Sequence, residues 1–114
     1  MQYDDAFDQL YGSCDDGLRD AIDQRVDFLR HHGNQTREPI SKPLGGGLFE
    51  LRANTHRAQA RFAFFFAPSR CIVFVYAFIK QGRKTPKHDL ALAKARRIQA
   101  LNDLERWNVP TFLN

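Results

Sequence analysis

The stretch QARFAFFFAPSRCIVFVYAFIK, residues 59–80, decides the fold of this 114-residue chain. Its first part, residues 59–66, alternates with a period of two, so that phenylalanines occupy one face of a strand and Arg61 lies on the other. Its last part, residues 71–80, is apolar on both faces until Lys80. The short connection between them favours an antiparallel hairpin. Apolar residues on both faces predict that both strands are central in a sheet and covered on each side.

A third strand is predicted just before this pair. Residues 48–53 alternate, with Glu50 and Arg52 on one face and apolar side chains on the other. The short connection over residues 54–58 extends the antiparallel meander. Upstream, residues 35–47 contain two prolines and three consecutive glycines and are predicted to be a connector.

Helical patterns flank the predicted strands. Ser13 and Asp16 have the spacing of a capping box, and the helix that follows carries an apolar stripe of Leu18, Ile22, Val26 and Leu29. Gly33 is a natural stop for that helix, and a short helix is expected before it, around residues 6–11. A final helix is predicted to begin with Thr85 as its cap and to run to about Arg106, packing through Leu90, Ile98, Leu101 and Leu104. The predicted class is therefore α+β.

The bulk composition limits the kind of protein. A chain of this length is expected to form one domain, residues 1–114. It has no apolar run of membrane-spanning length, and its acidic start is unlike a secretory signal. The two cysteines do not make a disulfide framework, which favours a reduced, cytoplasmic protein. The histidines and cysteines lack metal-binding spacing, so neither a metal site nor a cofactor is predicted.

The charges are divided unevenly along the chain. Residues 1–36 hold eight aspartates and three arginines, whereas residues 37–114 hold fourteen lysines and arginines and five acidic residues. The overall charge is +4, and the second region supplies all of the positive excess. Four cations fall within residues 80–87, at the junction between a strand and the last helix. Such a basic surface attracts a phosphate backbone, and RNA is the polyanion that we favour.

A cluster of cations is the candidate site. In an antiparallel meander, Arg52, Arg61 and Lys80 can converge on one surface of the sheet, next to the basic segment. An arginine on a central strand is costly unless an anionic group meets it. A purely structural alternative is that Arg61 pairs with Glu50, or with an aspartate of the long helix, while the other cations face water.

Three motifs carry a resemblance to a known family. KPLGGGLFELR, residues 42–52, resembles the KPLGxGLxELR opening of HigB-like toxins in the RelE/ParE superfamily. RFAFFF, residues 61–66, resembles the R-x-x-F-F strand of the phage-derived branch of that family. FIKQGRKTP, residues 78–86, resembles its F-x-K-K-x-x-K-T-P motif. The motifs occur in the family's order and spacing, and with the start of the next helix they extend the resemblance over residues 42–97.

The resemblance implies the toxin of a type II toxin–antitoxin pair. It implies a RelE-like fold, with N-terminal helices on an antiparallel sheet of three to four strands and a C-terminal helix. Many relatives begin with a strand, for which residues 1–5 leave very little room. The implied activity is a ribosome-dependent, metal-independent mRNA endonuclease that inhibits translation. The implied partners are a helix-turn-helix antitoxin, mRNA and the ribosome, with operator DNA bound only through the antitoxin.

The resemblance also suggests roles for individual residues. Arg52 and Arg61 would clamp the scissile phosphate, and Lys80 and Lys84 are candidates for proton transfer. An isolated lysine titrates near 10.4, so neighbouring cations must lower the pKa of a catalytic lysine. The residues predicted to contact RNA around this centre are Arg57, Arg83, Lys87 and His88. Related nucleases often use a late tyrosine or histidine, but Tyr76 and His56 are more simply a packed aromatic and an exposed side chain.

Two other functions are compatible with the sequence. Relatives of the ParE type keep the fold and inhibit DNA gyrase without cutting RNA. A non-catalytic RNA- or DNA-binding relative of the toxins is a further alternative. The cations expected on the sheet surface favour the nuclease, because an inhibitor that binds a protein does not need them there.

Overall fold

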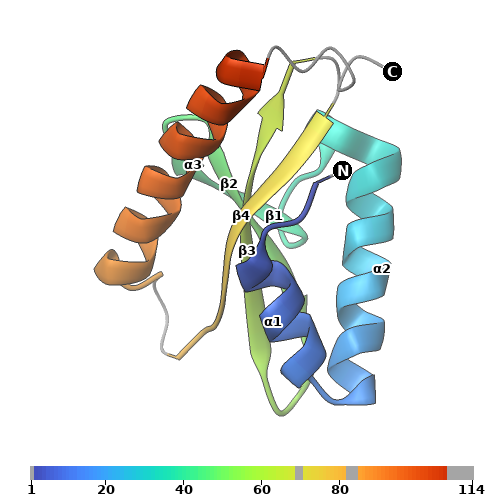
Figure 1. The fold of residues 1–114 in the computed structure, drawn as a ribbon. Coiled ribbons are helices and arrows are strands. Elements are labelled where there is room, and N and C mark those ends of the chain that lie inside the picture. Colours follow the sequence, from blue (N-terminus) through green and yellow to red (C-terminus); the bar gives the residue numbers. More distant parts are fainter. Residues whose placement is uncertain (1, 69–70, 82–84, 108–114) are drawn as a thin grey trace.

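The computed structural model describes residues 2–68, 71–81 and 85–107, with side chains up to residue 103. The chain begins with two helices, α1 (Asp5–Ser13) and α2 (Asp16–His32), followed by a 3-10 turn, η1 (Gly33–Gln35). Four strands and a last helix come next: β1 (Ser41–Gly45), β2 (Leu48–Asn54), β3 (Gln59–Ala67), β4 (Cys71–Ile79) and α3 (Lys87–Trp107). Figure 1 shows the helices arranged around one sheet, so the predicted α+β class is confirmed.

The sheet is an antiparallel meander in the order β1-β2-β3-β4. The three predicted strands match β2, β3 and β4, but β1 lies inside the predicted connector. Pro43 is tolerated there because β1 is an edge strand, where a missing N–H does not interrupt the sheet. The prediction that residues 71–80 form a central strand is wrong, because β4 is the other edge of this sheet. Gln2 adds a single parallel bridge to Val73 of β4.

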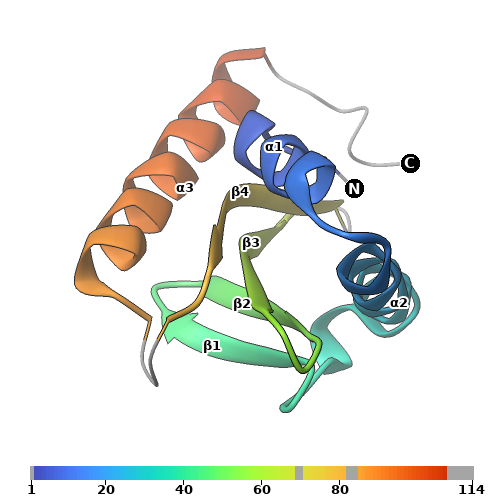
Figure 2. The same cartoon turned by 90° about the horizontal axis from the view of Figure 1, so that it is seen from below.

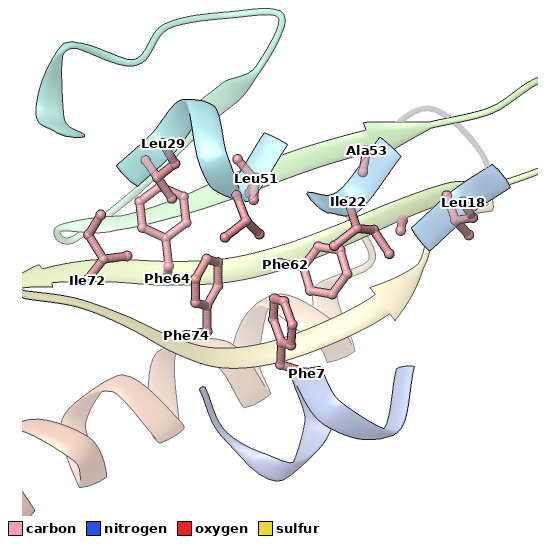
Figure 3. Packing of buried hydrophobic residues seen from close by; sticks show 12 residues of the cluster. Phe7, Leu18, Ile22, Leu29, Leu51, Ala53, Phe62, Phe64, Ile72 and Phe74 are labelled. Atoms are coloured by element: carbon pink, nitrogen blue, oxygen red, sulfur yellow. The ribbon is translucent and has the colours of Figure 1, made fainter. Parts of the chain in front are cut away.

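One face of the sheet packs against α1 and α2. The apolar stripe of α2 is buried as predicted, and it meets Leu51 of β2 and the phenylalanines of β3 and β4. Figure 3 shows these side chains interlocking between α2, α1 and the sheet. Phe7 of α1 lies in the middle of them, with its ring centroid 4.6 Å from that of Phe62 and 5.0 Å from that of Phe74. Burying one such side chain contributes about 1.5–3 kcal/mol.

The opposite face of the sheet packs against α3. Its smaller core contains Leu48, Phe65, Val73 and Val75 together with Ala93 of α3. Figure 2 shows α3 on this side of the sheet and α2 on the other. Ile98 was predicted to pack here, but it is 58% exposed. None of the described helices is long and apolar enough to span a membrane.

Two of the three predicted helix ends differ in detail. Asp15, not Ser13, caps α2: its carboxylate accepts a 2.8 Å hydrogen bond from the Leu18 N–H, while Ser13 closes α1 by donating to the Leu10 carbonyl. Gly33 ends α2 as predicted, with a positive φ of 54°. Thr85 does not cap α3, which begins two residues later. Its hydroxyl instead donates a hydrogen bond to the carboxylate of Glu50 in β2.

Candidate functional site

Arg52 and Arg61 are directly opposite each other on β2 and β3. Both lie on the α3 face of the sheet, since they alternate in step with Leu48 and Phe65 of the core on that side. Like charges in this position repel each other, so the pair needs compensation. The predicted convergence of the two arginines on one surface is therefore present in the structure.

A β-bulge brings Lys80 to the same face. Phe64 pairs with Phe74 and Ala63 pairs with Tyr76, so one extra residue, Val75, is inserted in β4. A bulge of this kind switches which side chains point to which face. Phe78 is consequently opposite Arg61, and the Lys80 N–H donates a 2.7 Å hydrogen bond to the Gln59 carbonyl. Lys80 thus follows β4 directly and lies beside the arginine pair.

Glu50 supplies the compensating negative charge. Its side chain is only 1% exposed, and its Oε1 lies 3.5 Å from Arg52 Nε and 3.6 Å from Arg61 Nε. Its other oxygen, Oε2, accepts a 2.6 Å hydrogen bond from the Thr85 hydroxyl. The Arg61–Glu50 pair of the structural alternative is therefore present in the structure.

Arg61 is held tightly by several partners. Its Nη1 donates to the side chain of Asn54 at 2.7 Å and to the Ala60 carbonyl at 2.9 Å, and its Nη2 donates to the side chain of Gln59 at 3.3 Å. The residue is 3% exposed. Burial lowers its pKa, Arg52 lowers it further, and Glu50 opposes both effects. Arg61 is thus a buried cation beneath the surface.

Arg52 is the more accessible arginine. Its side chain is 19% exposed, and its Nη1 lies 3.4 Å from the Oε1 of Glu38, whose own side chain is 63% exposed. Glu38 belongs to the segment that precedes β1. A ligand phosphate can therefore approach Arg52 from solvent only by competing with this carboxylate.

The electrostatic environment of Lys80 differs from that of an isolated lysine. Burial lowers the pKa of Lys80, and the positive charges of Arg61, Arg52 and Lys42 lower it further, while Glu50 raises it. A catalytic lysine needs a lowered pKa, because more of the neutral amine is then available near neutral pH. The environment of Lys80 shifts its pKa in that direction. The side chain is half-buried and so remains accessible to solvent.

Three of the four predicted RNA-contacting residues are described, and all three are exposed. Arg57 lies exposed in the connection between β2 and β3, and Lys87 and His88 are exposed in the first turn of α3. Arg83 and Lys84 lie outside the described residues. His56 is exposed next to Arg57.

Tyr76 is engaged in a separate contact. Its hydroxyl donates a 2.6 Å hydrogen bond to Asp89 of α3, and the Arg96 guanidinium lies over its ring at 5.1 Å. Burial and the hydrogen bond to Asp89 raise the pKa of Tyr76 to about 12. The phenol is thus a poor proton acceptor near neutral pH.

Other parts of the described surface offer different chemistry. A hollow of about 620 Å³ between α1 and α2 contains the carboxylates of Asp8, Asp23 and Asp27. That hollow lies on the opposite side of the sheet from Arg52 and Arg61. Within the described ranges, no three histidine, cysteine or acidic side chains gather as a metal site.

The sequence did not predict the roles of Thr85 and Glu38 in the cluster, and it predicted only part of the role of Glu50. Glu50 was considered only as a possible partner of Arg61, Thr85 was assigned to a helix cap, and Glu38 was not considered. The alternation of residues 48–53 does place Glu50 on the face of Arg52. A carboxylate two positions before an arginine in a strand was therefore a usable signal.

The fold and the cationic cluster define a small α+β protein with a basic site at one end of its sheet. Residues 11–97 match the family described as "Phage derived protein Gp49-like (DUF891)". Because the match covers most of the chain, this protein belongs to that family, a toxin-like family of the RelE/HigB type associated with toxin–antitoxin pairs. Such a family implies an antitoxin partner in general. No curated protein matches the chain significantly.

Proposed function

We propose that this chain is the toxin of a type II toxin–antitoxin pair and that it cleaves mRNA on the ribosome without a metal ion. One observation carries the proposal: Arg52, Arg61 and Lys80 share one end of one sheet face, and burial and the neighbouring arginines lower the pKa of Lys80. The family membership supports a toxin. The single domain, the cytoplasmic location and the helix-turn-helix nature of the antitoxin are part of the same proposal.

The chemistry of RNA cleavage assigns a task to each group. The 2′-oxygen must lose its proton and attack the adjacent phosphorus, and the 5′-oxygen must leave with a proton. The phosphate gains negative charge along the way, which fixed cations stabilise. Arg52 is the accessible guanidinium and contacts the phosphate, whereas the buried Arg61 adds positive charge from beneath it. Neutral Lys80 accepts the proton of the 2′-hydroxyl.

The remaining cations have supporting roles in this proposal. Arg57, Lys87 and His88 are exposed and hold the flanking RNA phosphates. Lys84 is the second candidate for proton transfer, and Arg83 is a further RNA contact. The acidic helices α1 and α2 lie on the other side of the sheet, so the charge distribution steers the basic end toward RNA.

The test is to induce the protein in bacteria and map mRNA 5′ ends. Wild-type protein should give cuts in phase with codons, and Lys80→Met and Arg52→Gln should abolish them. Lys94→Met removes an exposed lysine of α3 and should leave the cuts unchanged. Arg61→Ala is less informative alone, because it leaves the buried Glu50 without one of its partners. Intact mRNA with double-strand DNA breaks would instead indicate a gyrase inhibitor, and growth without arrest would indicate a non-catalytic relative.

A further inference from the structure

Glu50 joins three segments that are distant in sequence. Its carboxylate contacts Arg52 on its own strand, Arg61 on the neighbouring strand and Thr85, which lies 35 residues further along the chain. A buried carboxylate is costly unless its oxygens are paired. Both oxygens of Glu50 have partners, so the geometry satisfies that condition.

The contacts leave the outer ends of the arginines available. Glu50 meets both guanidinium groups at Nε, on the side nearest the sheet. The Nη1 of Arg52 extends further and meets the exposed Glu38. Glu50 is thus placed to orient the arginines from behind, and its own burial keeps it away from any ligand in solvent.

Both ends of the basic segment 80–87 are attached to this arginine pair. At its beginning, the Lys80 N–H donates to the Gln59 carbonyl, and the Gln59 side chain accepts from Arg61 Nη2. Toward its end, Thr85 donates to Glu50, which contacts Arg61 as well. Arg61 and Glu50 therefore connect the sheet to the start and to the end of the segment.

We propose that Glu50 and Thr85 are positioning residues that fix the described ends of the basic segment, residues 80–81 and 85–87, relative to Arg52 and Arg61. The kinetic consequence of this inference rests on the proposed nuclease function. The anchoring of the segment does not depend on that function. Glu50 is buried, and Thr85 acts through its hydrogen bond to Glu50. Misplacement of catalytic groups by about 1 Å can reduce a rate about a hundredfold while binding persists.

Thr85→Val is the most direct variant, because it keeps the side-chain shape and removes the hydroxyl donor. The matched control is Thr36→Val, since the buried Thr36 hydroxyl has no hydrogen-bond partner among the residues that the structure describes. Thr85→Ser restores the donor and should restore the wild-type behaviour. Glu50→Gln is informative only if circular dichroism shows that it folds, because it removes the charge that the buried Arg61 needs.

The first measurement is cleavage of mRNA on purified ribosomes by the folded variants. We expect Thr85→Val to lower the maximal rate about 10- to 100-fold and to leave the half-saturating concentration within about threefold. Thr85→Ser and Thr36→Val should match wild type. An unchanged rate for Thr85→Val, or an equal loss in Thr85→Ser, would overturn the positioning role.

The second measurement separates this inference from the proposed function. Amide hydrogen exchange over residues 80–92 should be at least about tenfold faster in Thr85→Val than in wild type, and unchanged in Thr36→Val. If wild type cleaves no RNA but this difference is present, the nuclease proposal fails and the anchoring stands. Equal exchange in Thr85→Val and wild type would refute the anchoring whatever the activity.

Discussion

Arg52 and Arg61 are register partners across β2 and β3, yet the Arg61 side chain is 4% exposed and the Arg52 side chain 19%. The two arginines share the Glu50 carboxylate, but their other partners differ. Arg61 donates to Asn54 and Gln59 within the sheet, whereas Arg52 meets the exposed Glu38. The pair therefore combines a structural cation with an accessible one.

Replacing the two arginines should affect stability unequally. Arg61→Gln leaves Glu50 short of a partner in a buried environment, and removing one member of such a pair costs about 3–5 kcal/mol. Arg52→Gln should cost only about 1 kcal/mol, because its ion pairs are partly exposed. Urea unfolding followed by circular dichroism gives both values. Equal losses would contradict the distinction between the two arginines.

Removing the carboxylate of Glu38 should strengthen RNA binding. Glu38 contacts Arg52 from the solvent side, so a phosphate must displace it. Glu38→Gln should tighten binding of single-stranded RNA about two- to fivefold and change stability by less than about 0.5 kcal/mol. Asp20→Asn alters the net charge equally on the exposed side of α2 and serves as the control. An equal gain in RNA affinity for both variants at a fixed salt concentration would contradict this prediction, because the change in net charge alone would then explain the effect.

The pKa of Lys80 should respond to its neighbours in opposite directions. Burial, Arg61 and Arg52 lower it, and Glu50 raises it. Arg52→Gln should therefore raise the Lys80 pKa toward its usual value, whereas a folded Glu50→Gln variant should lower it further. If neutral Lys80 is the proton acceptor, the cleavage rate rises with pH through this pKa. Lys42→Gln removes another positive charge that lowers the Lys80 pKa, outside the proposed catalytic groups, and should move the rising limb to higher pH. Carbon-13 NMR of the lysine side chains measures the pKa directly.

The lowered pKa of Lys80 also makes the free energy of unfolding depend on pH. The folded chain binds the Lys80 proton less tightly than the unfolded chain, so protonation of Lys80 disfavours folding at neutral pH. That penalty disappears as the pH rises from the folded pKa to the usual lysine value. Lys80→Met should accordingly be neutral or slightly stabilising at neutral pH in urea unfolding. A marked loss of stability would show that the charged amine has a structural partner.

Gly47 should not tolerate a side chain. Its φ is +83°, and an added Cβ would lie 3.0 Å from Arg97 Nη2. Gly47→Ala should destabilise the fold by about 1–2 kcal/mol from the backbone conformation alone. Gly12→Ala in α1 meets no atom within 4 Å and should stabilise the fold by up to about 1 kcal/mol. Thermal unfolding of the two variants should shift in opposite directions.

Local sequence patterns predicted the helices and strands that bury a regular stripe of apolar side chains. The spacing of Leu18, Ile22 and the following apolar residues gave α2, and the alternation around Arg52 and Arg61 gave β2 and β3. β1 was missed because prolines and glycines usually mark loops, and an edge position relaxes that rule. The edge position of β4 was missed because α1 and α3 cover its faces, and apolar faces do not reveal strand order.

The candidate site was predicted in part. The convergence of Arg52, Arg61 and Lys80 follows from antiparallel pairing, but Lys80 reaches the arginine face only through the bulge at Val75. No pattern in residues 71–80 predicts that bulge. The Thr85–Glu50 contact joins residues 35 positions apart, and hydrogen bonds of that range depend on tertiary packing.

The bulge makes the composition of the site depend on the number of residues in β4 as well as on their identity. Deleting Val75 would remove the extra residue and leave residues 76–80 on their present faces, because Tyr76 would still pair with Ala63 and Phe78 with Arg61. Inserting one residue between Ala77 and Phe78 would instead reverse the in–out parity of residues 78–80, so that Lys80 would point toward the α1 and α2 side and Ile79 would replace it beside the arginines. A single-codon insertion would in this way inactivate the proposed site without changing any of its residues. An alignment scored by residue identity alone would still count all of them as present.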